Sequence, residues 1–326
     1  MASFRKRGES WQARVKRFGY PDQVKTFPSK SSAEQWARSV ESSFDQGSFT
    51  DGKQLKRILF RDIIIRYIES VCPSHRGGTA ETIRLRALLR RPLASVSLSN
   101  LSPAIIADYR DQRLRLCSSS TVVRELAMLS AIINHARREW SITMQNPVSL
   151  VRKPAMPEGR SRILNSDEEI RLMHEIEPRG RRNPLMKPIV VFALETAMRL
   201  NEIIMLEWRN VDFKSRTALL PMTKNGLSRT VPLSTTAIKT LADLERTSGK
   251  VFPIKAAALQ RAFLMALRRA RIDDFHFHDL RHTATTRMAQ KLPNVIELAA
   301  VTGHRSLHML KRYYHPRASE LAEKLG

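Results

Sequence analysis

The chain has 326 residues, and its 56 Lys and Arg against 31 Asp and Glu give a formal charge of +25. This excess of positive charge favours an anionic partner, usually nucleic acid, over a basic protein that binds nothing in particular. Two cysteines, Cys72 and Cys117, exclude a disulfide framework and a cysteine zinc site. No apolar run reaches the roughly 18 residues that span a bilayer, and no signal peptide opens the sequence, so we expect a cytoplasmic protein.

Residues 1–50 are predicted to form a small unit of three strands and a helix. The strands are expected in SFRKR, WQARVKRF and QVKTF, which turn residues separate, and the helix near 31–44. In the second strand apolar and basic side chains alternate, so one face of the sheet is basic. We interpret Arg14, Lys16 and Arg17 as DNA contacts on this unit, with a merely solvated face as the alternative.

Residues 55–151 have helical periodicity and predict a four-helix domain with basic faces. The longest predicted helix places five apolar residues on one stripe: Val122, Leu126, Leu129, Ile133 and Ala136. On its other side we expect Arg124 to contact DNA. No helix-turn-helix or zinc-finger pattern is evident, so this region alone indicates only an all-α, basic domain.

The segment 152–162, RKPAMPEGRSR, is predicted to be a linker because its prolines, glycine and basic side chains oppose regular structure. A capping box of Ser166 and Glu169 is expected to open the next domain, 163–326. Two domains joined by a short basic linker could close around a duplex. Charges of the linker would then add affinity without sequence specificity.

Arg199 lies in an apolar stretch, VVFALETAMRLNEIIMLEW, that we expect to be helical. A charged side chain in such surroundings is costly unless it is paired. Glu202, three residues later, is within reach as a partner. Taken alone, this pair fits a structural role as well as a functional one.

Two short predicted strands, ALLPMT and LSRTVPL, flank Lys224, Asn225 and Gly226. Asn-Gly accepts the positive φ angles of a type I′ turn, so we predict a hairpin. Lys224 would then stand beside a tight turn, from which a long cation can project into a groove. Lysines at hairpin tips are usually only solvated, so this position alone indicates little.

The segment HFHDLRH, 276–282, would place His278, Arg281 and His282 on one face of a helix. The i, i+4 spacing of the two histidines suggests zinc. Arg281 between them would repel a dication, however, and we therefore predict no metal site. An arginine beside a histidine suits a phosphate better, because one neutralises charge and the other transfers a proton.

The segment GHRSLHMLKRYYHP, 303–316, contributes His304, Tyr313, Tyr314 and His315. Free tyrosine titrates at about pH 10, so a tyrosine nucleophile needs cations or a base close by.

In order and spacing, these clusters resemble the active-site series of the tyrosine recombinases, or phage integrases. TAMRLNE resembles the family's first-arginine box, TKNGLSRTVPL its lysine hairpin, HDLRH its His-x-x-Arg box, and GHRSLHMLKRYYH the box that ends in the nucleophile. In the family the tyrosine lies nine residues beyond the histidine of the last box and is followed by x-His, which selects Tyr313 over Tyr314. Many members have Gly where this chain has Ala197, a change that we expect to need only a helical backbone.

The resemblance covers about residue 160 to the end and implies a multidomain, mainly α protein. Its parts would be the small β-sheet-plus-helix unit as an arm-type DNA-binding unit, the four-helix region as a core-binding domain, and a mixed α+β catalytic domain with a small β-hairpin sheet. It also implies chemistry without metal or other cofactor. Tyr313 would attack a DNA phosphate to form a 3′-phosphotyrosyl link and release a 5′-hydroxyl.

The resemblance assigns a role to each matched side chain. Arg199 and Arg281 would grip the scissile phosphate, and Glu202 would orient Arg199. Lys224 would protonate the leaving oxygen, His278 would act as the acid–base partner, and His304 would donate a hydrogen bond to a phosphate oxygen. We add Arg229, next to the hairpin, to the expected DNA contacts.

The expected partner is double-stranded DNA with specific recombination sites, bound by a homotetramer on paired sites, with no membrane and with accessory DNA-bending or directionality proteins left open. Integration and excision are the first choice. Inversion is the second, because the sequence also resembles shufflon recombinases, which carry a long extension beyond the tyrosine that this sequence does not have. A type IB topoisomerase and a non-catalytic regulator are less favoured. A short apolar stripe at 318–325 could dock within one protomer or on its neighbour.

Overall fold

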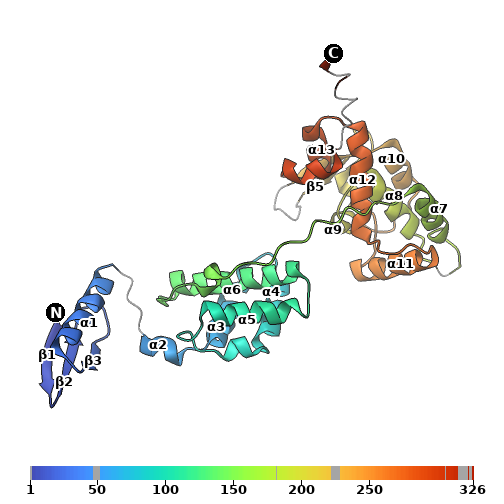
Figure 1. The fold of residues 1–326 in the computed structure, drawn as a ribbon. Helices are drawn as coiled ribbons and strands as arrows, with labels where there is room; N and C mark the ends of the chain where they lie inside the picture. Colours follow the sequence, from blue (N-terminus) through green and yellow to red (C-terminus); the bar gives the residue numbers. More distant parts are fainter. Residues whose placement is uncertain are drawn as a thin grey trace. The chain divides into compact units, whose positions relative to one another are not determined.

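The computed structural model describes residues 2–46, 52–180, 182–221, 228–304, 306–314, 322 and 325–326. The chain divides into two compact units, 1–158 and 159–326, which are described separately (Figure 1). The boundary falls within the predicted linker, whereas the further division of the first unit into two domains stays a prediction. Among the described helices, none is both long and apolar enough to cross a membrane.

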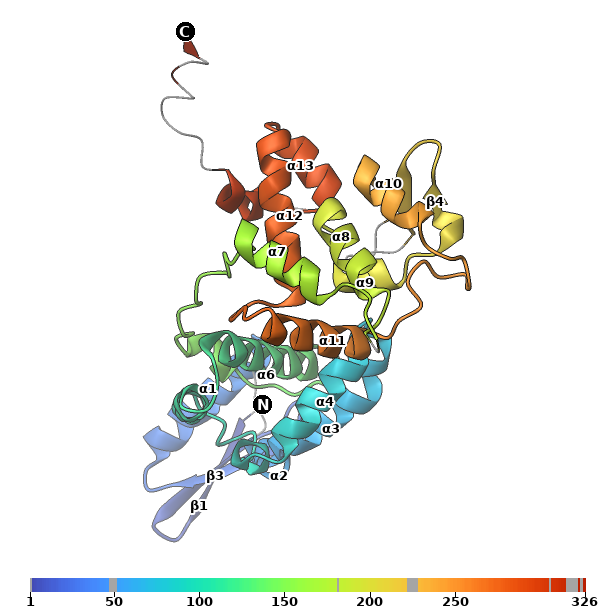
Figure 2. The same ribbon diagram turned by 90° about the vertical axis from the view of Figure 1, so that its right-hand side faces the viewer.

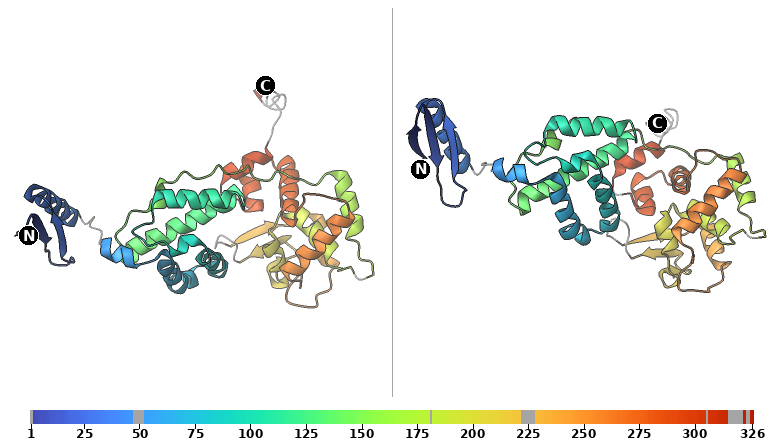
Figure 3. Two further views of the ribbon diagram at one scale, coloured as in Figure 1. Left: turned by 60° about the horizontal axis from the view of Figure 1, so that its bottom comes forward. Right: turned by 90° about the horizontal axis from the view of Figure 1, so that it is seen from below.

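The first unit opens with an antiparallel sheet in the order β1-β2-β3, formed by β1 (Ala2–Arg7), β2 (Ser10–Val15) and β3 (Gln23–Phe27). Helix α1 (Lys30–Asp45) covers one face of this sheet, as Figure 3 shows. Val15 of β2 is buried there with Ala37 and Phe44 of α1, whereas Arg14 points to solvent. The predicted three strands and helix are thereby confirmed.

The rest of the first unit is helical. It contains α2 (Gly52–Arg57), α3 (Phe60–Ser70), α4 (Gly78–Leu89), α5 (Pro103–Leu114) and α6 (Ser119–Glu139). All five residues of the predicted apolar stripe in α6 are buried in one core. The four predicted helices correspond to α3 through α6, and the short α2 precedes them.

The second unit is a helical domain with one small sheet. Its helices are α7 (Ser166–Glu175), α8 (Met186–Thr196), α9 (Leu200–Ile204), α10 (Thr235–Ala242), α11 (Ala256–Arg269), α12 (Phe277–Lys291) and α13 (Val295–Thr302), followed by the 3-10 helix η5 (Leu307–Tyr313). Helix α12 packs against α8 and α13 (Figure 2). This arrangement confirms the predicted mainly α fold class.

The sheet of the second unit is antiparallel in the order β4-β5-β6, with β4 (Val211–Asp212), β5 (Thr217–Leu220) and β6 (Arg229–Pro232). Strands β5 and β6 pair as the hairpin that the sequence predicts, with Leu220 opposite Arg229. The predicted turn, including Lys224, lies in 222–227, outside the described residues.

The capping box of α7 begins one residue earlier than predicted. The Asn165 side chain accepts a hydrogen bond from the Glu168 amide (2.8 Å), and the Glu168 carboxylate accepts one from the Asn165 amide (3.2 Å). Asn is as good an N-cap as Ser. Glu169, which was expected to complete the box, is instead ion-paired with Arg287 of α12.

The backbone around Ala197 also differs from the prediction of a helix. Helix α8 ends at Thr196, and Ala197 adopts a left-handed conformation with φ 50° and ψ 22°. Arg199 is therefore the N-cap of the separate helix α9 and does not lie inside a long helix. The position where many recombinases have Gly is one whose backbone conformation favours Gly.

Substitutions at Ala197 test this strain. Left-handed geometry costs a non-glycine residue about 1–2 kcal/mol, and Gly would relieve that while losing a buried methyl group and chain entropy. We expect Ala197→Gly to change the free energy of unfolding by less than about 1 kcal/mol, and Ala197→Val to lower it by about 2 kcal/mol or more. Urea denaturation measures both, with Ala242→Val at the exposed end of α10 as the control. A harmless Ala197→Val would contradict the left-handed backbone.

Candidate active site

Arg281 of α12 lies at the centre of a cluster of polar side chains in the second unit. Its side chain is buried, with 4% of the residue exposed. The guanidinium donates hydrogen bonds to the carbonyl oxygens of Ala197 (2.5 Å) and Thr302 (2.7 Å), where α8 and α13 end. Helix C-termini leave carbonyls unpaired and carry partial negative charge, so they suit a cation. Burial and the charge of Arg199 lower the pKa of Arg281 to about 9, which leaves it charged at neutral pH.

His304 follows the glycine that caps α13. Its Nε2 lies 3.3 Å from Nη2 of Arg281, and its Nδ1 lies 2.7 Å from Oγ1 of Thr302, whose hydroxyl donates to Leu298. Nδ1 therefore carries the proton and Nε2 accepts from Arg281. Burial and the charge of Arg281 lower the pKa of His304 to about 4, so the imidazole is neutral at pH 7.

Tyr313 faces this cluster, and its neighbour Tyr314 does not. The Tyr313 hydroxyl lies 2.5 Å from Nδ1 of His282, and the two rings stack with centroids 6.0 Å apart. The Tyr314 hydroxyl instead donates to the carbonyl of Leu292. Of the two adjacent tyrosines, Tyr313 is therefore the one that lies beside the histidines, and its role as the nucleophile stays a prediction.

The protonation states of His282 and Tyr313 follow from their surroundings. Burial and the neighbouring His278 lower the pKa of His282 to about 4. Burial raises the pKa of Tyr313 and outweighs the charges of Arg312 and Arg281, which act in the opposite direction. The phenol is therefore protonated at neutral pH and lies against a neutral imidazole, to which it can donate in the tautomer that leaves Nδ1 unprotonated.

Glu202 pairs with two arginines. Its carboxylate accepts hydrogen bonds from the amide (2.8 Å) and side chain (2.9 Å) of Arg199, and from Nη2 of Arg229 (2.9 Å). Burial alone would raise the pKa of Glu202, but the Arg199 amide and the charges of Arg229 and Arg199 lower it below its ordinary value. The predicted pair of Arg199 and Glu202 is present, with a third member that the sequence did not indicate.

Arg229 is turned inward, against Glu202, and not onto an open surface as expected of a DNA contact. Its guanidinium lies over Gly303, where an added Cβ would come within 2.7 Å of Cζ. Gly303 has φ +69°, so both its backbone and this close approach require glycine. Within the described part of the chain, the buried Nε of Arg229 has no hydrogen-bond partner.

The structure brings together the predicted residues Arg199, Glu202, His278, Arg281, His304 and Tyr313, while Lys224 lies outside the described residues. His278 is exposed, and its ring meets that of His282 edge-on at 5.4 Å. The roles assigned from the resemblance did not include His282, which is the histidine that contacts the Tyr313 hydroxyl. Its position on one helix face with Arg281 was the available signal, but nothing in the sequence showed which histidine reaches Tyr313.

The remaining predicted DNA contacts lie in the first unit. Arg14 and Arg17 form exposed ion pairs with Asp22 and Asp45, both at 2.5 Å. Lys16 is exposed, and so is Arg124, whose Nε donates to the carbonyl of Ser120. Among the described residues, no three His, Cys, Asp or Glu side chains form a group that could hold a metal ion.

Comparisons with known proteins agree with this geometry. Residues 162–320 match the phage integrase family. A shufflon-specific DNA recombinase of Escherichia coli is 40% identical over 282 residues, covering 83% of this chain and 73% of that protein. A putative integrase/recombinase of Haemophilus influenzae is 35% identical and covers 99% of this chain and 89% of its own length. A lambda integrase tetramer bound to a Holliday junction shares the fold, with a TM-score of 0.64 at 18% identity over 93% of this chain and 95% of that chain.

Glu202→Gln tests the role of the carboxylate. Leaving two half-buried guanidinium groups without a counter-charge should lower the free energy of unfolding by about 3 kcal/mol at pH 7. Since the pKa of Glu202 is lower in the folded than in the unfolded protein, its contribution is present above about pH 4.3 and is lost as the pH falls through the folded pKa. Urea denaturation of the wild type and of Glu202→Gln between pH 7 and pH 3 should show the difference between their free energies of unfolding becoming smaller as the pH falls.

The matched control is Glu207→Gln, which removes a carboxylate paired with the well-exposed Arg209. This change should cost less than about 1 kcal/mol. Equal effects of the two substitutions would contradict a special role for Glu202.

Proposed function

Since the chain belongs to the phage integrase family and is a site-specific tyrosine recombinase, we propose that Tyr313 is the residue that attacks the scissile DNA phosphate. The observation that carries this proposal is the 2.5 Å contact between the Tyr313 hydroxyl and Nδ1 of His282, next to the buried Arg281. The contact gives the phenol an acceptor for its proton. The arginine supplies positive charge where the phosphate would bind.

His282 is then the group that takes the proton of Tyr313. In the tautomer protonated at Nε2, its neutral imidazole would present the Nδ1 lone pair to the hydroxyl, whereas His278, the expected acid–base partner, meets the His282 ring edge-on. As the proton passes to Nδ1, the phenolic oxygen bonds to phosphorus and the bond from phosphorus to O5′ breaks. His278 lies edge-on to the same ring, and its charge lowers the pKa of His282, so it favours return of the proton from the imidazolium.

Arg199, Arg281 and His304 form the phosphate site. The two guanidinium groups offset the charge of the non-bridging oxygens as the pentacoordinate transition state forms. Glu202 holds Arg199 through the side-chain hydrogen bond and fixes its direction. Donation by Nε2 of His304 to a phosphate oxygen requires that nitrogen to be protonated, which an arriving anion favours because it raises the pKa of a neighbouring imidazole.

Lys224 remains our candidate for protonating the leaving O5′, on the ground of the resemblance. The strands that flank its turn support this role. Arg229, the first residue of β6, packs over Gly303 and against Glu202, so β6 begins beside the proposed phosphate site. In the sequence, Lys224 precedes Arg229 by five residues.

The substrate we propose is a DNA duplex with specific sites, which Arg14, Lys16, Arg17 and Arg124 would contact through phosphates. Four protomers on paired sites would act together, as in the tetramer of lambda integrase, in the cytoplasm and with accessory DNA-bending proteins. Integration and excision of a mobile element are the first candidate outcome. The relative named as shufflon-specific, at 40% identity, favours inversion as the second. Sequencing DNA recovered on Tyr313 decides between them, because inversion requires sites in opposite orientation within one molecule.

Tyr313→Phe tests the nucleophile. Without the hydroxyl, no covalent protein–DNA adduct should form on a nicked substrate that traps the intermediate, as measured on a denaturing gel. Tyr314→Phe is the matched control and should still form the adduct, because the Tyr314 hydroxyl donates to the Leu292 carbonyl and not to His282. An adduct with Tyr313→Phe would show that another residue attacks.

His282→Gln tests the proton acceptor. Loss of a general base should slow adduct formation by about 10²–10⁴-fold, and His278→Gln should have a smaller effect. Because the pKa of His282 is lowered to about 4, the wild-type rate should not fall as the pH drops from 7 through the ordinary histidine range, and should decline only below about pH 5. A larger defect in His278→Gln would favour His278 as the base.

A further inference from the structure

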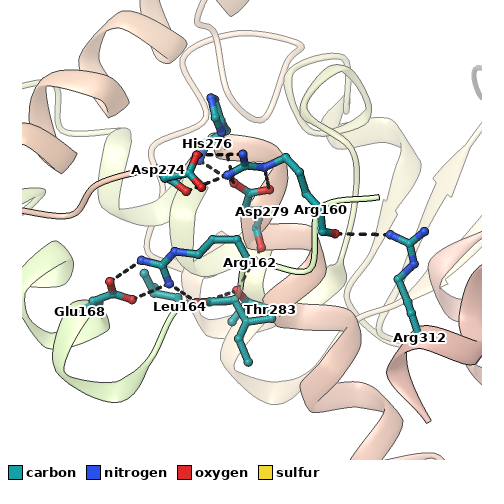
Figure 4. Close-up of polar contacts among 10 residues, drawn as sticks. Arg160, Arg162, Leu164, Glu168, Asp274, His276, Asp279, Thr283 and Arg312 are labelled. Atoms are coloured by element: carbon teal, nitrogen blue, oxygen red, sulfur yellow. Dashed lines mark hydrogen bonds and ion pairs between the residues drawn. The ribbon is translucent and has the colours of Figure 1, made fainter. Parts of the chain in front are cut away.

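The first residues of the second unit run along the helix that carries the histidines (Figure 4). Arg160 donates from Nη2 and Nε to the carboxylate of Asp279, at 3.0 and 3.3 Å. It also donates to the side chain and carbonyl of Asp274, at 2.9 and 2.7 Å. Four residues later the Leu164 amide donates to Oγ1 of Thr283 (2.9 Å). We call residues 159–164 the strap.

Asp279 connects the strap to the start of α12. Only 1% of this residue is exposed, and its carboxylate accepts the His276 amide (2.8 Å) at the N-terminus of the helix. A buried carboxylate at this position needs a cation, and Arg160 supplies it. Burial would raise the pKa of Asp279, but the hydrogen bond from Arg160 and that from the His276 amide lower it. The strap thus fixes the first turn of α12, directly before Arg281 and His282.

The strap also meets the element that carries Tyr313. Arg312, the residue before the tyrosine, donates to the carbonyl of Arg160 (3.4 Å). A Cβ added to Gly159 would lie 2.7 Å from both terminal nitrogens of Arg312. Glycine at 159 therefore leaves the room that the Arg312 side chain occupies.

We propose that Gly159 and Arg160 are positioning residues, which hold Tyr313 against His282 by bracing η5 and α12 at the same time. The proposal rests on the proposed function, since it assumes that Tyr313 attacks. Helix α12 and η5 share an apolar cluster that includes Ala289 and Leu310, and the hydroxyl–imidazole contact is their polar contact at the site, so rotation of either element would separate Tyr313 from His282. A third segment bonded to both removes this freedom, and a displacement of about 1 Å from attack geometry can cost 10²-fold in rate.

Gly159→Ala is the sharpest test, because it pushes only the end of a flexible side chain and leaves Asp279 with its partner. The single-turnover rate of adduct formation is measured at saturating DNA, next to the DNA affinity and the melting temperature. We expect the rate to fall by about 10-fold, with the other two quantities unchanged. Arg162→Lys is the control, because Arg162 lies in the strap but bonds Glu168 of α7 and packs on Phe275.

The route through Arg312 is tested by combining the substitutions. If Gly159→Ala acts by displacing Arg312, it should have no further effect on the rate in an Arg312→Ala protein. Arg160→Lys, which keeps the charge but not the paired geometry, should lose part of the rate and Arg160→Ala more.

The outcomes separate two failures. A wild-type protein without an adduct on Tyr313 overturns the proposed function and this inference with it. A normal adduct rate in Gly159→Ala, with wild type active, overturns the inference alone. A lower rate that appears equally in Arg162→Lys, or that follows a loss of DNA affinity or of melting temperature, also overturns it, since the effect would then not be positional.

Discussion

A single buried guanidinium organises the second unit. Arg281 ties the ends of α8 and α13 to the second turn of α12 through the carbonyls of Ala197 and Thr302. Both helices end in a left-handed residue, Ala197 and Gly303, which turns the chain away and leaves the last carbonyls facing the arginine. Stripped of water, a guanidinium is stable only when its donors are satisfied. The hydrogen bonds that Arg281 needs therefore fix the two turns, and with them the positions of Arg199 and His304. Arg199 follows Ala197 by two residues, and His304 follows Gly303 by one.

Charge and proton transfer are divided between different side chains in this site. Arg281 stays charged despite burial, whereas His282 and His304 are kept neutral by burial next to cations. The same positive surroundings that suit a phosphate therefore keep the two imidazoles from being protonated at neutral pH. In the proposed mechanism, this division lets the imidazole of His282 accept a proton from Tyr313 at a pH where an ordinary histidine would be partly charged.

Local patterns predicted the parts of this structure that depend on neighbours in the sequence. The alternation of β2, the stripe of α6 and the hairpin of β5 and β6 follow from periods and turn residues, and Tyr313 was separated from Tyr314 by spacing alone. What the sequence could not show are contacts between distant residues. Arg229 meets Glu202 across 27 positions and Arg160 meets Asp279 across 119, and no periodicity encodes such pairs. The helix predicted through Ala197 was wrong for a related reason. The left-handed backbone there lets the Ala197 carbonyl accept a hydrogen bond from Arg281, a residue 84 positions away.

The pairing around Glu202 has a consequence for the protein before DNA arrives. One carboxylate serves both Arg199 and Arg229, while Arg281 is held by neutral groups, so the positive charge of the three arginines exceeds the negative charge beside them in a largely buried cluster. This excess of charge opposes folding. A small anion that binds among the arginines would offset it, because a ligand of the folded state alone shifts the equilibrium toward that state. We therefore expect sulfate or inorganic phosphate to have two opposite effects on this protein. Binding among the arginines would stabilise the fold, and under the proposed function it would compete with the DNA backbone for the same side chains.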